Sequence, residues 1–145
     1  MFRILLVDDD PSVAVLLKEV MHNLHGKHEL YYVGSGMEAL DFLYCRGAYE
    51  SAQRPNLILL DVHMPQLSGL EVLTVIKNDP ELYVIPVIML STSDSREDIR
   101  RSYEAHANCY VQKPTDLGRS VKLVQALEAF WIDIALLPSC AELRP

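Results

Sequence analysis

The sequence predicts a doubly wound α/β fold, in which a parallel five-stranded sheet lies between two layers of helices. Two observations support this class: five short apolar segments are rich in β-branched residues, and a segment with helical signals follows each of them. Because the two kinds of segment alternate strictly, right-handed crossovers between parallel strands give a three-layer sandwich. The 145 residues are enough to bury the core of one such domain.

The expected strands are short and mostly apolar. The first, third and fourth are almost continuously hydrophobic, which is typical of strands covered on both faces. The second alternates to some extent between polar and apolar residues, which indicates a position nearer an edge of the sheet. The five segments are Arg3–Asp8, His28–Val33, Leu57–Asp61, Pro86–Leu90 and Cys109–Gln112.

Each expected helix begins at a residue whose side chain can cap it. Two of these, Ser35 and Ser68, are followed three positions later by a glutamate, which is the spacing of a capping box. The last helix is expected over Leu117–Leu136. The helix starts are Asp10-Pro11, Ser35, Ser68, Asp94-Ser95 and either Thr115 or Asp116.

The overall charge argues against nucleic acid or an anionic membrane as a partner. The chain has 13 Lys and Arg against 20 Asp and Glu, a net charge of −7, whereas both partners need a basic face. The cysteines Cys45, Cys109 and Cys140 are widely spaced without a CxxC pair, so we expect free thiols in a reducing cytosol. The N-terminal segment meets acidic residues too early for a signal peptide or a membrane span.

Polar side chains follow four of the expected strands, at the edge where ligands bind in open parallel sheets. They are Asp8, Asp9 and Asp10 after the first strand, Asp61 at the end of the third, Ser91-Thr92 after the fourth, and Gln112-Lys113-Pro114 after the fifth. The converging carboxylates would repel one another unless a cation lay among them. Carboxylate oxygens with positions left for water suit Mg²⁺ better than zinc or iron.

This set of groups is what phosphorylation of an aspartate requires. A carboxylate that attacks phosphorus needs a metal ion to neutralise the surrounding anionic charge. Asp61 is the candidate nucleophile, and Lys113 and Ser91 can each contact a phosphoryl oxygen. A hydroxyl drawn toward the phosphate leaves space in its loop, which a neighbouring aromatic ring can fill, so the contact can act as a switch.

Four stretches of the sequence resemble the signature blocks of response-regulator receiver domains. They are ILLVDDDP, LILLDVHMPQLSG, the pair Ser91-Thr92 after PVIML, and YVQKP, in the family's order and spacing. The resemblance covers essentially the whole chain and implies a receiver domain over residues 1–137 with a C-terminal tail, 138–145. It also implies the flavodoxin-like strand order 2-1-3-4-5.

The resemblance assigns a role to each matching residue. It makes Asp61 the phosphoacceptor, Lys113 the lysine that contacts phosphate, and Ser91 and Tyr110 the switch pair. It implies a cis peptide bond between Lys113 and Pro114, and a domain that catalyses its own phosphorylation and dephosphorylation without being a metabolic enzyme. The implied Mg²⁺ ligands are Asp8, Asp9, Asp61 and the backbone carbonyl of His63.

A closer similarity concerns single-domain regulators that partner bacterial phytochrome-type histidine kinases. It rests on a long insert, 46–55, and on the blocks STSDSREDI, NCYVQKPTDL and AFWIDIALLP. That subgroup tends to dimerise through its fourth and fifth helices and fifth strand. The apolar residues Phe130, Trp131, Ile134 and Leu137 fit either the core or a partner face; we favour the partner face, with Val121, Val124, Leu127 and Ala135 turned inward.

The same residues also allow other interpretations. Asp8 and Asp9 could form a solvated turn, and Lys113 could be an ordinary exposed lysine, but their convergence with Asp61 favours a site. A haloacid-dehalogenase-type phosphatase would need its nucleophile on the first strand, and a degenerate scaffold would lack one of these groups. We expect the His63 side chain to bind no metal, and the other histidines to lie at the surface: His22, His25, His28 and His106.

Overall fold

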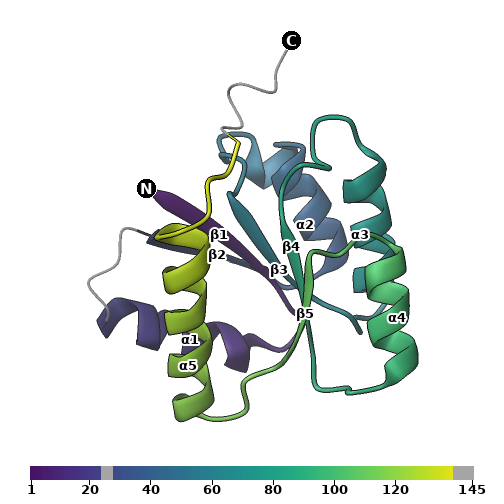
Figure 1. Cartoon of the computed structure of the whole chain (residues 1–145). Helices are drawn as coiled ribbons and strands as arrows, with labels where there is room; N and C mark the ends of the chain where they lie inside the picture. The colour runs from purple at the N-terminus through teal and green to yellow at the C-terminus, as the bar shows by residue number, and fades with distance from the viewer. Residues whose placement is uncertain (24–27, 139–145) are drawn as a thin grey trace.

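The computed structural model describes residues 1–23 and 28–138, and its five parallel strands lie in the order β2-β1-β3-β4-β5 (Figure 1). This order confirms the prediction and places β2 at an edge of the sheet. The strand bounds agree with the expected ones to within one residue. They are β1 (Phe2–Val7), β2 (His28–Val33), β3 (Leu57–Asp61), β4 (Val87–Ser91) and β5 (Cys109–Gln112).

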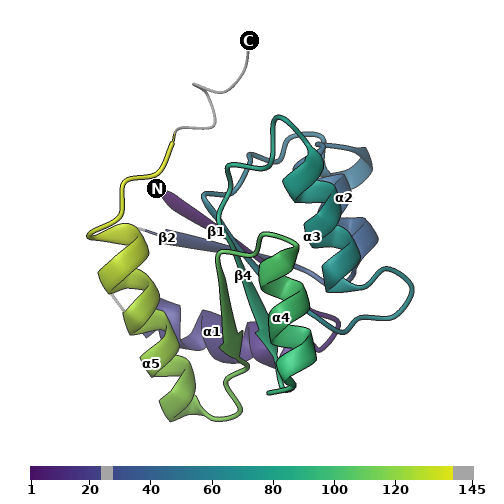
Figure 2. The ribbon, with the colours of Figure 1, turned by 45° about the vertical axis from the view of Figure 1, so that its right-hand side comes forward.

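The helices form a layer on each side of the sheet. Two of them, α1 and α5, cover one face, and the other three cover the opposite face (Figures 1 and 2). A short 3-10 turn over Gly47–Tyr49 follows the second helix. The helices are α1 (Pro11–Asn23), α2 (Gly36–Leu43), α3 (Gly69–Asn78), α4 (Arg96–Glu104) and α5 (Leu117–Leu127).

Alternating residues of the central strands fill two separate cores. On β1, Ile4 and Leu6 contribute to the core under α1 and α5, whereas Leu5 and Val7 contribute to the core under α2 and α3. All four side chains are fully buried. This explains why the first, third and fourth strands are continuously hydrophobic, because neither of their faces meets water.

The predicted caps are found at all five helices, and at α1 the Oδ1 of Asp10 accepts from the backbone N–H of Ser12. Ser68 forms a complete capping box with Glu71, while the Oγ of Ser35 accepts from the backbone N–H of Glu38. The carboxylate of Glu38 accepts instead from the N–H of Gly34 (3.3 Å). Ser95 caps α4, and Asp116 rather than Thr115 caps α5.

The prediction that the last helix continues to Leu136 is wrong. Regular helix ends at Leu127, and a π-helical turn over Glu128–Ile132 follows. The wider turn shifts the apolar stripe, so Trp131 packs partly against the core while Phe130 and Ile134 stay 52% and 68% exposed. Leu137, expected on a partner face, instead lines a small hollow with Pro55 and Pro86 at the amino ends of β3 and β4.

One histidine departs from the expected surface position. The His28 side chain is only 2% exposed, and its Nδ1 lies 3.5 Å from an Oε1 of Glu128, because β2 turns it toward the α1 and α5 layer. His22 and His106 are exposed as predicted. Cys45 and Cys109 are free thiols, whereas His25, Cys140 and residues 139–145 of the predicted tail lie outside the described residues. Across residues 1–23 and 28–138, no helix combines the length and apolar character needed to span a bilayer.

Candidate active site

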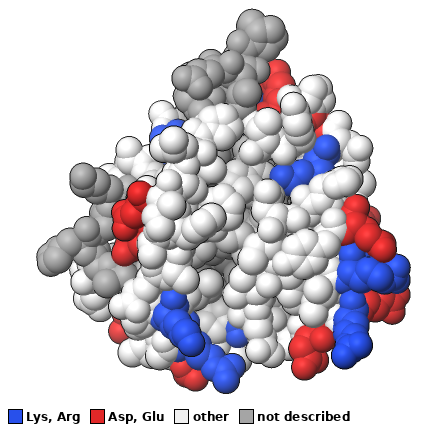
Figure 3. Space-filling view, viewed as in Figure 1, with Lys and Arg blue, Asp and Glu red and all other residues white. Residues whose placement is uncertain are grey.

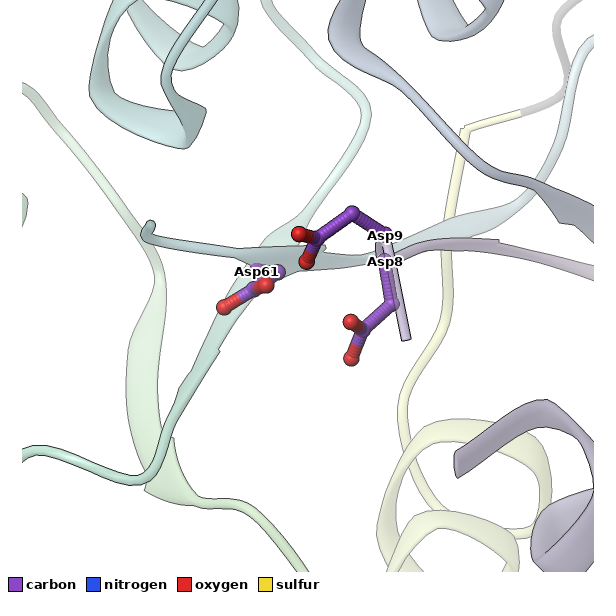
Figure 4. Close-up of side chains that lie close together, drawn as sticks. All are labelled: Asp8, Asp9 and Asp61. Carbon is purple, nitrogen blue, oxygen red and sulfur yellow. The ribbon is translucent and has the colours of Figure 1, made fainter. Parts of the chain in front are cut away.

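Three carboxylates meet where β1 and β3 end. Asp8 is fully buried, Asp61 is 3% exposed, and Asp9 is exposed to solvent. One oxygen from each lies within 4.8 Å of the others, and Figure 4 shows the three groups gathered around one space. The strands bring them together because β1 and β3 are hydrogen-bonded neighbours, with Val7 opposite Leu60. The predicted acidic cluster is therefore present.

Lys113 reaches this cluster from the end of β5. Its Nζ lies 2.9 Å from an Oδ2 of Asp8 and 3.1 Å from an Oδ2 of Asp61. The backbone N–H of Lys113 donates to the carbonyl of Ser91 (2.8 Å), which continues the pairing of β5 with β4. The expectation of a cis peptide bond before Pro114 is wrong in this structure, where the bond is trans. Lys113 bridges the two aspartates from this trans backbone.

The charges in the cluster are not balanced. Burial, and secondly the charge of Asp8, raise the pKa of Asp61 to about 7, although Lys113 opposes them. Burial alone would lower the pKa of Lys113, but its contacts with Asp8 and Asp61 raise it above the usual value. The Oδ2 of Asp8 has an ion-pair contact with Lys113 but no hydrogen bond among the described residues. A divalent cation fits this set of oxygen donors, because it would offset the excess negative charge.

Backbone and side-chain hydrogen bonds fix the two buried carboxylates. The N–H of Asp10 donates to an Oδ1 of Asp8 (2.9 Å), and the N–H of His63 donates to an Oδ1 of Asp61 (3.4 Å). The hydroxyl of Tyr32, on β2, donates to the backbone carbonyl of Asp8 (2.8 Å). No role for Tyr32 was predicted from the sequence. The signal that could have indicated its contact with Asp8 is the pairing of β2 with β1, which places Val33 opposite Val7.

Ser91 and Tyr110 both hold the loop between β4 and α4. Ser91 is 1% exposed, and its Oγ accepts from the N–H of Ser93 (3.0 Å). The hydroxyl of Tyr110 donates to the carbonyl of Ser93 (2.9 Å). The two residues that the resemblance pairs as a switch therefore contact the same loop residue, Ser91 at its backbone N–H and Tyr110 at its carbonyl.

The side chain of His63 makes a contact that the sequence did not suggest. Its Nε2 lies 2.8 Å from an Oδ2 of Asp98 on α4, and this contact is the main reason why the pKa of Asp98 is below its usual value. The contact joins the loop after β3 to α4. The role of the His63 backbone carbonyl as a metal ligand stays a prediction.

The sheet order and the position of the acids and the lysine together define the class of α/β signalling receivers. The chain belongs to the response regulator receiver domain family, whose model matches residues 4–127.

Individual relatives resemble the chain over almost its whole length. The response regulator Rcp1 of Synechocystis sp. is 43% identical over 136 residues, which cover 94% of this chain and 92% of the relative. The crystal structure of the Mn(2+)-bound form of response regulator Rcp1 superposes with a TM-score of 0.87 at 42% identity, covering 96% of this chain and 100% of that one. The phosphorylated cyanobacterial phytochrome response regulator RcpA gives 0.88 at 43% identity, with coverage of 95% and 99%.

Proposed function

We propose that the chain accepts a phosphoryl group on Asp61 from the phosphohistidine of a sensor histidine kinase, in a Mg²⁺-dependent reaction. The observation that carries this proposal is the buried Asp8 and Asp61 pair bridged by Lys113, with Asp9 beside it. The Mn(2+)-bound form of the relative Rcp1 supports the binding of a divalent cation. This role is that of a signalling module that catalyses its own modification.

Each group of the chain has a part in the transfer. A carboxylate oxygen of Asp61 forms a bond to phosphorus while the bond from phosphorus to the imidazole nitrogen of the donor breaks. Asp8, Asp9, Asp61 and the His63 carbonyl would hold Mg²⁺, which supplies positive charge to the phosphoryl oxygens. Lys113, already 3.1 Å from Asp61, is placed to contact one of those oxygens.

A small phosphodonor tests the reaction without a kinase. Acetyl phosphate with Mg²⁺ is expected to add one phosphoryl group, which peptide mass spectrometry places on the peptide that contains Asp61. Because the cluster carries excess negative charge, chelation by EDTA should abolish the mass gain and added Mg²⁺ should restore it. Equal labelling with and without EDTA would contradict the proposal.

Ser91 is proposed to couple the phosphoryl group to the conformation of the β4–α4 loop. Its hydroxyl now accepts from Ser93, and turning toward phosphate would release that contact beside Tyr110. Ser91→Ala should still be phosphorylated but should shift the loop less, because a charge-assisted hydrogen bond is worth about 1.5–3 kcal/mol. Amide NMR with beryllium fluoride measures the shift, and equal shifts in the variant and the unmodified protein would disprove this role.

The kinase partner is proposed to be of the phytochrome type, acting in the cytoplasm. RcpA, a phytochrome response regulator by its description, matches 95% of the chain at 43% identity. The net charge of −7 supports a protein partner rather than nucleic acid or an anionic membrane. A phosphotransfer screen against histidine kinases tests this assignment, and transfer only from kinases of another sensor class would overturn it.

A homodimer through α4, β5 and α5 is also proposed. Figure 3 shows that the face over β5, between α5 and α4, carries few charged side chains, while charges of both signs gather over α4. Phe130 and Ile134 add exposed apolar surface beyond α5. Such patches commonly mark interfaces, and closed two-fold dimers are the most frequent assembly.

Sedimentation velocity of Phe130→Ala tests the dimer. Phe130 is a better probe than Trp131, because Trp131 packs against the core and its loss would destabilise the fold. We expect the dissociation constant to rise about tenfold or more, as for a central aromatic contact. The control is Val15→Ala, which removes an apolar side chain that is 64% exposed on α1. An unmodified protein that stays monomeric at tens of micromolar, with and without beryllium fluoride, would refute the dimer.

A further inference from the structure

A cleft of about 550 Å³ opens beside β2, and neither the cluster acids nor Lys113 line it. The cleft runs along β2 from Glu29, which lies opposite Arg3 on β1, to Tyr32, whose hydroxyl donates to the carbonyl of Asp8. Its second wall comes from the segment 46–55, between α2 and β3. The lining residues are Glu29, Tyr31, Tyr32, Phe42, Ala48, Tyr49, Ser51, Ala52 and Gln53.

Three aromatic rings stand in a row along this cleft. The ring centroids of Tyr31 and Phe42 are 5.7 Å apart, and those of Phe42 and Tyr49 are 5.5 Å apart, with the ring planes tilted by 48° and 55°. Phe42 is buried, but Tyr31 is 37% exposed. The faces of exposed tyrosine rings attract cations that approach within about 6 Å of the centroid.

Two carboxylates increase the negative charge at these rings. The hydroxyl of Tyr31 donates to Glu29, and the hydroxyl of Tyr49 donates to Glu38 (3.3 Å). The first contact raises the pKa of Tyr31, and burial together with the charge of Glu38 raises the pKa of Tyr49. Both hydroxyls therefore stay protonated at neutral pH and keep their carboxylates as acceptors.

No basic side chain forms an ion pair with these two carboxylates in the described part of the chain. Within residues 1–23 and 28–138, neither Glu29 nor Glu38 forms an ion pair, and the lining residues include no lysine or arginine. Arg3, which lies opposite Glu29 in register, donates its Nε–H to the carbonyl of Arg54 (3.2 Å). The charge of Arg3 acts on Tyr31 from nearby, but the cleft still combines aromatic faces with two carboxylates that form no ion pair among the described residues.

The wall formed by 46–55 is held in place before any ligand arrives. An Nη2 of Arg54 lies 2.6 Å from an Oε2 of Glu81, and the Arg54 side chain is only 9% exposed. The Sγ of Cys45 donates to the carbonyl of Ala52 (3.2 Å), and the N–H of Ala52 donates to the carbonyl of Tyr49 (3.0 Å). A pre-formed wall lowers the entropy cost of binding.

We propose that this cleft binds an arginine side chain from a partner protein, whether or not Asp61 is phosphorylated. A planar guanidinium can stack on the Tyr31 ring and donate to Glu29 at the same time, which the compact ammonium of lysine does less well. The net charge of −7 favours the approach of a basic segment. The insert thereby gives the receiver a second recognition surface, whose lining residues are other than the acids and the lysine of the phosphorylation site.

An NMR titration of the full chain tests the cleft with a minimal probe. The probe is the capped pentapeptide GGRGG, and its counterpart carries citrulline, which keeps the shape of arginine but lacks the charge. We expect saturable shifts of the Tyr31 and Tyr49 ring signals with the arginine peptide. The citrulline peptide should bind at least about fivefold more weakly than the arginine peptide.

Matched variants locate the binding. Glu29→Gln and Tyr31→Leu should each weaken binding about threefold or more, and Glu19→Gln, which removes one exposed negative charge on α1, should leave it unchanged. Beryllium fluoride should not alter the affinity. Three results would each overturn the proposal: citrulline and arginine peptides that bind equally well, a Glu19→Gln variant that loses as much affinity as the cleft variants, or shifts confined to residues outside the cleft. These results do not depend on the outcome of phosphorylation at Asp61.

Discussion

Replacing Asp61 with asparagine is expected to abolish phosphorylation by acetyl phosphate completely, while the protein stays folded. The amide cannot form the acyl phosphate. Asp61 is also the carboxylate of the cluster that both contacts Lys113 and lies at the end of β3. Intact-mass spectrometry in Mg²⁺ measures the loss. A mass gain that persists in Asp61→Asn would show that another residue is the acceptor.

Thermal unfolding in chelator separates this loss from misfolding. At pH 8 the carboxylate of Asp61 is ionised, because its pKa of about 7 lies below that pH. Since this pKa is above the ordinary value of 3.8, the ionised form is less favourable in the folded than in the unfolded protein. Asp61→Asn removes that cost, so its free energy of unfolding should equal or exceed that of the unmodified protein.

Asp10→Asn is the matched control for Asp61→Asn. Asp10 is a neighbouring acid in the sequence, but it is exposed and its Oδ1 caps α1 by accepting from the N–H of Ser12 (3.0 Å). Asparagine caps a helix about as well as aspartate. Asp10→Asn should therefore retain both stability and phosphorylation, and loss of either would indicate a more general role for the charge of the loop.

Gly69→Ala is expected to have the largest effect on stability of any single-methyl change in the chain. A Cβ at Gly69 would lie 1.8 Å from the backbone oxygen of Asp61 and 2.9 Å from the Cα of Val62. Both neighbours are backbone atoms, which cannot rotate away as a side chain can. The N–H of Gly69 also donates to the carbonyl of Val62 (2.9 Å), so the start of α3 is fixed against the end of β3.

The clash should lower both the free energy of unfolding and the rate of phosphorylation. Overpacking in rigid surroundings costs about 3 kcal/mol, which is roughly a 10 °C fall in the melting temperature for a domain of this size. If the backbone shifts to relieve the clash, Asp61 moves away from Lys113 and phosphorylation slows. Calorimetry and the acetyl phosphate assay measure the two effects.

Gly118→Ala is the control for Gly69→Ala. Gly118 also lies in the first turn of a helix, α5. A Cβ there would come no closer than 3.4 Å to its nearest neighbour, an Oδ1 of Asp116. Alanine has the higher helix propensity, so this variant should be at least as stable as the unmodified protein. Equal destabilisation by the two substitutions would mean that the packing of α3 against β3 is not the cause.

The sequence by itself determined the fold class and the strand order that its family resemblance implies. Continuous hydrophobic segments mark the three central strands, and a capping residue marks each helix start. It also determined which residues meet at the functional edge. Parallel strands deliver the residues after their carboxyl ends to one edge, so Asp8, Asp61 and Lys113 could be brought together without coordinates.

Only the tertiary structure decided the contacts that depend on packing between elements. The π-helical turn after Leu127 changes which side of the last segment faces the core, so that Trp131 packs against the core. The burial of His28 beside Glu128 and the contact of His63 with Asp98 join residues far apart in sequence. Periodicity reports the direction of a side chain relative to its own strand or helix, whereas such contacts depend on how the layers pack together. The physical information that was missing is the relative placement of the elements.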